Sequence, residues 1–312
     1  MDYNQLGASG LTVSGVGLGC NSFGVTVAPD RVPAVVDSAL AAGITLFDTA
    51  DIYGARPGQS EELLGSALGR RRDEVVVATK FGMDMAGANG PDWGVRGSRR
   101  YIRRAVEASL RRLGTDYIDL YQIHAFDPLT PVGETVAALS ELVTEGKVRY
   151  LGTSNFTGWQ IVDADWNARA AGLNRFVAGQ NAYSLLDRGV ESEVLPALRH
   201  VGAGLLAYYP LASGLLTGKY RRGLPAPAGS RLTRRPERLR QADFDTIEAI
   251  EAFAAARDLP VATVAIGFLA AQDAVASVLC GASAPDQVTN NVAALSWHVS
   301  TADRQELAAL SG

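Results

Sequence analysis

Four side chains of complementary chemistry stand at intervals through the first half of the chain. They are a carboxylate, a phenol, an ammonium group and an imidazole: Asp48, Tyr53, Lys80 and His124. A phenol has an ordinary pKa of about 10, so Tyr53 is protonated at neutral pH and can serve as a general acid. Lys80 is the candidate for a nearby cation that lowers this pKa, and Asp48 would pair with Lys80 and keep it charged. Such a group is suited to protonating an oxygen that gains negative charge.

Three of these residues close short apolar runs rich in Val, Ile and Leu. Continuous hydrophobicity predicts strands that are buried on both faces, as in a parallel sheet covered by helices. The eight runs are Val16 to Cys20, Ile44 to Asp48, Val75 to Lys80, Ile118 to His124, Val148 to Thr153, Phe176 to Gln180, Leu205 to Tyr208 and Val275 to Cys280.

Segments with helical spacing lie between the runs and complete a repeating β-then-α pattern. Examples are Val32 to Ala42, Glu61 to Leu68, Tyr101 to Leu113, Val132 to Glu145 and Phe244 to Ala256. Gly43, Gly114, Gly146 and Gly172 follow four helical segments, where positive φ ends a helix. We therefore expect one α/β domain over residues 1–312, a (β/α)₈ TIM barrel. The first residues, around Tyr3 to Val13, predict a β-hairpin that closes the bottom of the barrel.

Barrel enzymes carry their active sites at the C-terminal ends of the strands. The polar residues that close the runs should therefore converge on one rim, although they span most of the sequence. They are Asp48, Lys80, His124, Ser154, Asn155, Gln180, Tyr209 and Ser283.

Motifs along the whole chain resemble those of the aldo-keto reductase family. They are FDTADIYG, SEELLGSAL, VVVATKFG, YIRRAVEASLRRLGTDYIDLYQIH, GKVRYLGTSNF, QNAYSLLDR, YYPLASGLLTGKY and GASAPDQVTNN. The resemblance implies an NADP-dependent enzyme that transfers a hydride from NADPH to an aldehyde or ketone. Asp48, Tyr53, Lys80 and His124 would then be its catalytic group, with Tyr53 as proton donor and His124 orienting the carbonyl oxygen.

The resemblance also implies a cofactor site. Ser154, Asn155 and Gln180 would hold the nicotinamide carboxamide, and Tyr209 would pack near the ring. Gly281, Ser283, Gln287 and Asn291 would lie at the adenosine and phosphate end, where a helix N-terminus favours anions. Further contacts are expected from Cys20, Asn21, Asp48, Tyr208, Pro210, Leu211, Ser213 and Lys219.

Arg221 to Arg240 contains seven arginines and one Glu, and in related proteins a loop at Arg231 closes over the dinucleotide. We interpret Arg231 as a phosphate clamp, with a solvated surface loop as the alternative. Many relatives place Lys or Arg after the GxS segment, where this chain has Ala284 and Pro285. That departure weakens the preference for NADPH, although NADH is still the less favoured cofactor.

Aromatic side chains in the loops that follow the strands are candidates for a substrate pocket: Phe23, Trp93 and Phe126. Ordinary loop packing is an equal alternative for each. The substrate is a small carbonyl compound whose identity depends on the loops, among them Gly82 to Ser98 and Lys219 to Arg240.

Several other readings are disfavoured. Gly15, Gly17 and Gly19 suggest a Rossmann dinucleotide motif, but Cys20 occupies the place of the third glycine, and no helix opens there. His200 and His298 show no ligand spacing with His124, so we expect no metal. Cys20 and Cys280 should be reduced, and whether they approach each other is open.

A net charge of −4 disfavours nucleic acid and anionic membranes as partners. The apolar stretch Val201 to Gly218 contains Pro210 and several glycines, so a buried strand plus loop is favoured over a membrane span. The N-terminus lacks the pattern of an export signal, and we expect a cytoplasmic protein. The sequence does not indicate the oligomeric state.

A second hypothesis comes from a different class of protein. The sequence is also similar to the potassium-channel beta subunits, in which the barrel and the cofactor site serve a partner. The chain would then be a cofactor-binding regulatory subunit with little or no turnover.

Overall fold

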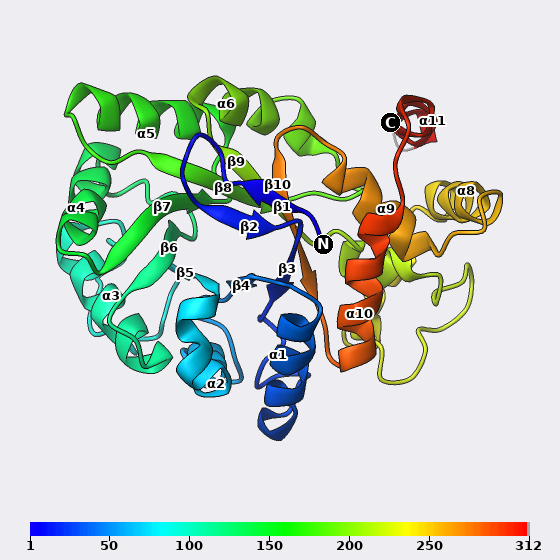
Figure 1. Ribbon diagram of the computed structural model, residues 1–312, viewed down its shortest axis with the longest axis horizontal. Helices are drawn as coiled ribbons and strands as arrows, with labels where there is room; N and C mark the ends of the chain where they lie inside the picture. Colours follow the sequence, from blue (N-terminus) through cyan, green and yellow to red (C-terminus); the bar gives the residue numbers. More distant parts are fainter. Residues whose placement is uncertain (311–312) are drawn as a thin grey trace.

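The computed structural model describes residues 1–310 and contains the predicted closed barrel of eight parallel strands (Figure 1). The strands follow one another in chain order around the ring, and β10 pairs with β3 to close it. Their bounds lie within two residues of the predicted runs: β3 Val16–Gly19, β4 Leu46–Asp48, β5 Val76–Phe81, β6 Ile118–Ile123, β7 Val148–Ser154, β8 Phe176–Ala182, β9 Gly204–Tyr208 and β10 Val275–Gly281.

Helices surround the barrel and cover the outward faces of the strands (Figure 1). The α-helices are α1 Val32–Ala41, α2 Gln59–Leu68, α3 Arg99–Leu113, α4 Val132–Thr144, α5 Gly158–Ala170, α6 Val194–Val201, α7 Pro236–Arg240, α8 Phe244–Ala255, α9 Val261–Ala270, α10 Pro285–Ala293 and α11 Thr301–Leu310. Short 3₁₀ helices are η1 Pro29–Arg31, η2 Gly69–Glu74, η3 Gly189–Glu191, η4 Ala212–Thr217, η5 Arg231–Arg234 and η6 Ala294–Ser296. The four glycines predicted to end helices all adopt positive φ.

The N-terminal hairpin closes one end of the barrel, as predicted. β1 (Tyr3–Gln5) pairs antiparallel with β2 (Thr12–Ser14). Leu6, Leu11 and Val13 pack into a core with inward-facing strand residues such as Leu120 and Leu206. The N-terminal end is therefore filled with apolar side chains, and a cleft that leads into the barrel would open at the opposite end.

The arginine-rich segment after β9 is not the plain loop that the sequence predicted. It contains η5 and α7, and a small core of Tyr220, Leu232, Phe244 and Ile247 holds it against α8. Leu232 is fully buried in that core. Arg231 is therefore anchored by its neighbour in the chain.

The two cysteines lie on neighbouring strands but are both free thiols. The register of β10 on β3 pairs Cys280 with Leu18, so Cys20 lies two residues farther along. Strand geometry then puts their Cα atoms roughly 8 Å apart. A disulfide needs about 7 Å or less, so the pair is not positioned to form one.

The stretch Val201 to Gly218 forms the end of α6, then β9 and η4, in agreement with the prediction of a buried strand followed by a loop. Of the helices within residues 1–310, none is both long and apolar enough to cross a bilayer.

Candidate active site

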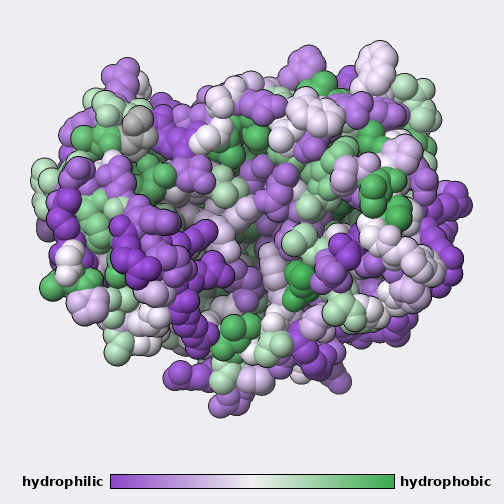
Figure 2. All heavy atoms as spheres, turned by 180° about the vertical axis from the view of Figure 1, so that it is seen from behind, coloured by the Kyte–Doolittle hydropathy of each residue, from purple (hydrophilic) through white to green (hydrophobic). Residues whose placement is uncertain are grey.

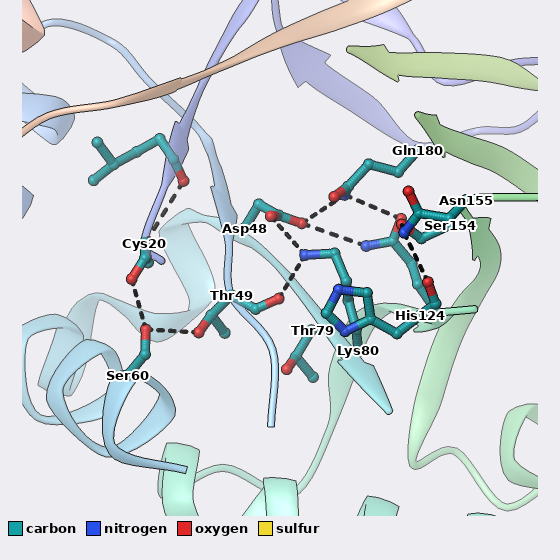
Figure 3. A network of polar contacts seen from close by, with 12 residues as sticks. Cys20, Asp48, Thr49, Ser60, Thr79, Lys80, His124, Ser154, Asn155 and Gln180 are labelled. Atoms are coloured by element: carbon teal, nitrogen blue, oxygen red, sulfur yellow. Dashed lines mark hydrogen bonds and ion pairs between the residues drawn. The ribbon is translucent and has the colours of Figure 1, made fainter. Parts of the chain in front are cut away.

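A buried ion pair lies at the C-terminal end of β4 and β5. Lys80 is fully buried, and its Nζ donates to Asp48 Oδ2 at 2.7 Å and to the Thr49 carbonyl oxygen at 2.8 Å (Figure 3). Burial alone would lower the pKa of Lys80, but Asp48 and Tyr53 together raise it above its ordinary value. Lys80 is therefore charged at neutral pH, at the barrel rim.

The carboxylate of Asp48 also receives amide groups from two other strands. Gln180 Nε2 donates to Asp48 Oδ1 at 2.7 Å, and Gln122 Nε2 lies 3.4 Å from the same oxygen. Side chains from alternate strands form layers inside such barrels, and these three residues from β4, β6 and β8 make a polar layer. Sequence reasoning missed Gln122. A polar residue inside the apolar run LYQIH, two positions before His124, was the available signal.

Tyr53 lies in the segment after β4, next to both Lys80 and His124. Lys80 Nζ is 5.0 Å from the centroid of the Tyr53 ring. The Tyr53 and His124 rings meet edge to face, with centroids 5.7 Å apart and an interplanar angle of 83°. The four predicted side chains are thus brought together.

The pKa of Tyr53 differs from the expectation. Burial raises it above the ordinary value of 10.0, and the opposing effect of Lys80 is smaller. The prediction that Lys80 would lower the pKa is therefore wrong for the net effect, because the sequence does not reveal the cost of burying a phenolate. Tyr53 holds its proton firmly at neutral pH.

His124 is a neutral imidazole at the end of β6. Burial, with a smaller contribution from the charge of Lys80, lowers its pKa from 6.5 to about 3. Its Nδ1 is buried and has no hydrogen-bond partner among residues 1–310. A neutral imidazole carries one N–H donor and one acceptor nitrogen.

Ser154, Asn155 and Tyr208 form a second polar cluster beside the first, at the ends of β7 and β9. Asn155 Nδ2 donates to the His124 carbonyl oxygen at 2.9 Å and to Ser154 Oγ at 3.1 Å. The Tyr208 hydroxyl donates to Asn155 Oδ1 at 2.6 Å. The two clusters are therefore linked through His124, whose carbonyl oxygen accepts from Asn155 (Figure 3).

The segment after β9 turns sharply and brings arginines to the rim. Tyr209 and Ser213 adopt positive φ, which is uncommon for residues other than glycine. Arg231 lies over the Tyr209 ring at 5.1 Å, and Arg238 donates to Ser213 Oγ at 2.9 Å. Pro210, Leu211 and Lys219 belong to the same turn, with Lys219 beside the Tyr220 ring.

The end of β10 leads into α10 beside the end of β3. The Ser283 backbone N–H donates to Gln287 Oε1 at 2.8 Å, ahead of the first turn of α10. Asn291 is buried on that helix. A Cβ added at Gly281 would still lie 4.0 Å from Asn21 Oδ1, so the backbone is open there. Cys20 is buried, and burial raises the pKa of its thiol.

These strand ends open on the face opposite to the hairpin. Figure 2, which views the molecule from behind, shows a hollow near the middle of that face. Strongly hydrophilic side chains gather on one side of the hollow.

The three aromatic residues predicted to line a substrate pocket lie in different settings. Phe126 is half-buried and meets the Phe156 and Trp159 rings edge to face. Trp93 is 67% exposed in the loop after β5 and contacts Arg100. Phe23 is fully buried in the main core. Its prediction as a pocket residue is therefore not supported, because the segment after β3 folds back onto the barrel.

Sequence reasoning also missed a buried polar network around Asp51, two residues before Tyr53. Asn89 donates to Asp51 Oδ2 at 2.9 Å, and Arg112 donates to Asn89 Oδ1 at 3.1 Å and to Glu61 Oε2 at 2.6 Å. Burial and the negative charge of Glu61 raise the pKa of Asp51 to about 8. The network ties the segment that carries Tyr53 to α2, α3 and the loop after β5.

No group of three or more His, Cys, Asp or Glu side chains within residues 1–310 is arranged to hold a metal ion.

A closed barrel with an ion pair, a phenol and an imidazole at one rim defines the class of protein, and sequence comparison agrees. Residues 15–311 match the model of the aldo/keto reductase family. The chain therefore belongs to the aldo/keto reductase family.

Three relatives illustrate the range of the family. The chain is 43% identical to "Uncharacterized oxidoreductase YrpG" of Bacillus subtilis (strain 168), covering 76% of this chain and 74% of that protein. It is 36% identical to "L-glyceraldehyde 3-phosphate reductase" of Escherichia coli (strain K12), covering 95% and 88%. It is also 36% identical to "Probable voltage-gated potassium channel subunit beta" of Oryza sativa subsp. japonica, covering 95% and 91%.

Proposed function

We propose that this oxidoreductase reduces a small aldehyde or ketone with NADPH and that Tyr53 donates the proton. The observation that carries the proposal is the contact of Tyr53 with both Lys80 and His124, beside a buried Asp48–Lys80 pair. Tyr53 combines a firmly held proton with an adjacent cation, which is what a proton donor to a developing alkoxide requires.

The rim residues suit a nicotinamide dinucleotide, which supplies the hydride when bound. Asn155, Tyr209 and Ser213 all adopt positive φ, and such strained residues cluster at ligand sites. Ser154, Asn155 and Gln180 offer the amide and hydroxyl groups that a carboxamide requires. Ser283 and Gln287 stand at the start of α10, where backbone N–H groups favour a phosphate. Arg231, beside Tyr209, would clamp the 2′-phosphate side and favour NADPH over NADH.

The protein's own side chains would transfer the proton, stabilise the charge that forms and orient the substrate. Tyr53 Oη passes its proton to the carbonyl oxygen of the substrate as that oxygen gains negative charge. Lys80 stabilises the phenolate that Tyr53 becomes, and Asp48 and the Thr49 carbonyl hold the ammonium group in place. His124 is neutral, so it orients the same oxygen through an N–H group without competing as an acid.

The test follows the loss of NADPH absorbance with a panel of short aldehydes and ketones. Glyceraldehyde 3-phosphate belongs in the panel, because the Escherichia coli relative is named as its reductase. We expect turnover by the wild type and a loss of about 10² to 10⁴ in kcat for Tyr53→Phe. Unchanged turnover in that variant would remove Tyr53 from its role.

A second candidate function is a cofactor-binding regulatory subunit, favoured by the similarity to the rice channel subunit. Tight NADPH binding without turnover of any carbonyl in the panel, together with co-purification of a larger membrane protein, would support it. A cytoplasmic location is still a prediction.

A further inference from the structure

Helix α5 exposes apolar side chains on the face that points away from the barrel. Its inner face is buried through Ile161, Ala164 and Ala168. On the outer face Trp159 is 58% exposed, Val162 37% and Trp166 70%. Trp159 meets the Phe126 ring edge to face, but a helix that only covers a barrel needs one apolar face, so the fold does not explain why most of the outer stripe is apolar.

We propose that the outer face of α5 is a dimer interface that packs against α5 of a second copy of this chain, with the two helices antiparallel. In Figure 1, α5 lies at the periphery between α4 and α6, so a second molecule can approach it without meeting the hairpin. The spacing, the charges and the area of the stripe all suit a second copy of the chain.

The spacing of the stripe is self-complementary. Residues 159, 162 and 166 lie on one side of a helix, separated by three and four positions. A two-fold rotation about the point midway between Val162 and Asp163 exchanges positions 159 and 166. Trp159 of each copy then meets Trp166 of the other, as an isologous interface requires. Aromatic pairs are among the strongest contacts at such interfaces.

The charges beside the stripe agree with the same arrangement. Arg169 lies near the C-terminus of α5; its Nε is paired with Asp165 at 2.7 Å, and half of its side chain is still exposed. Glu193 is exposed at the N-terminus, where it accepts from the Trp159 N–H at 3.1 Å. The rotation brings Arg169 level with position 156 of the other copy. Position 156 is within one helical turn of the Trp159 N–H, to which Glu193 of that copy is hydrogen-bonded. Both residues lie on the side of α5 that faces α6, so each Arg169 approaches a Glu193 and the contact occurs twice.

The area is adequate for the centre of a stable dimer. A tryptophan side chain can bury up to about 250 Å², so the exposed parts of the two tryptophans amount to roughly 640 Å² over two copies. A stable interface buries at least about 1,200 Å² in total. The stripe therefore supplies roughly half, and the flanking α4 and α6 surfaces would have to supply the rest.

A membrane surface fits this face less well. Interfacial helices carry Lys and Arg on their polar side. Here Asp163 and Asp165 flank the stripe, and Arg169 and Arg175 are both engaged with Asp165.

The experiment is sedimentation velocity over about 1 to 100 µM protein, a range that covers micromolar dissociation constants. We expect a dimer for the wild type and for Trp166→Phe. We expect Trp166→Glu to raise the dissociation constant at least tenfold. The matched control is Ala252→Glu, which adds the same charge to an exposed position on α8, far from α5, and should leave the dimer intact.

A charge exchange tests the antiparallel arrangement. Arg169→Glu and Glu193→Arg should each weaken the dimer, and the variant that carries both should recover it. Thermal unfolding of each variant shows whether the fold is retained. A monomeric wild type, a Trp166→Glu variant that still dimerises, or a folded double variant without recovery would overturn the proposal.

Discussion

Gln180 donates a hydrogen bond of 2.7 Å to Asp48 across the full width of the barrel. Their strands, β8 and β4, stand four places apart in a closed ring of eight and therefore face each other. Lys80 donates to the other carboxylate oxygen, Oδ2. Asp48 is thus fixed from two sides, and the position of the Lys80 charge beside Tyr53 depends on this arrangement.

Removal of Lys80 should destabilise the protein strongly, because Asp48 would be left as a buried, uncompensated charge. We expect Lys80→Met to lower the free energy of unfolding by roughly 3 to 5 kcal/mol, measured by urea denaturation. The double variant Asp48→Asn with Lys80→Met leaves no buried charge and should lose less. A single variant as stable as the wild type would contradict the burial of the pair.

His124 should make the wild type sensitive to acid. Its pKa is about 3 in the folded protein and about 6.5 when unfolded, so the unfolded chain binds a proton first as the pH falls. Between pH 6.5 and 3 the free energy of unfolding should fall by up to about 1.4 kcal/mol per pH unit from this group. His124→Gln removes that part of the slope. His298→Gln, at an exposed histidine, should leave the slope of the free energy of unfolding against pH unchanged. Equal slopes for the wild type and both variants would refute the lowered pKa of His124.

Ionisable Asp51 should lower the free energy of unfolding at neutral pH. Its pKa is about 8 in the folded protein against 3.8 ordinarily, so stability is fully present below pH 4 and is lost progressively up to pH 8. We expect Asp51→Asn, which keeps an oxygen for Asn89, to become more stable than the wild type as the pH rises through this window. Asp30→Asn, at an exposed carboxylate, is the control. A stability difference between the variant and the wild type that does not change between pH 4 and pH 8 would contradict the raised pKa of Asp51.

Arg231 should discriminate between the two nicotinamide cofactors. A charge-assisted contact to a phosphate contributes about 1.5 to 3 kcal/mol. Arg231→Ala should therefore weaken NADPH binding by about tenfold or more and leave NADH binding nearly unchanged, as measured by fluorescence titration. Arg222→Ala is the matched control from the same segment, since its guanidinium is engaged with Asp245 and Glu248. If Arg231→Ala lost equal affinity for NADPH and NADH, Arg231 would not be a clamp for the 2′-phosphate.

The barrel was predictable because its signals are local. Each strand is a short continuous apolar run, and each helix that ends at a glycine carries its own stop signal. The helical content of the Arg221 to Arg240 segment was missed, because Leu232 and Tyr220 are ordered by a small core with α8 that no local pattern reveals.

The candidate site was predictable only in part. Residues at strand ends, such as Asp48 and His124, follow from topology. The orientation of side chains does not, which is why Gln122 was overlooked and Phe23 was placed in a pocket. The pKa of Tyr53 also depends on the balance between burial and the distance to Lys80, and neither quantity can be read from residue types.

A structure of the protein with NADP⁺ and an unreactive carbonyl analogue tests the central claim most directly. The account predicts that the analogue's oxygen lies within hydrogen-bonding distance, about 2.6 to 3.2 Å, of both Tyr53 Oη and a His124 ring nitrogen, with the nicotinamide ring against the same carbonyl carbon. An oxygen bound elsewhere, or a Tyr53 hydroxyl turned away from it, would contradict the account.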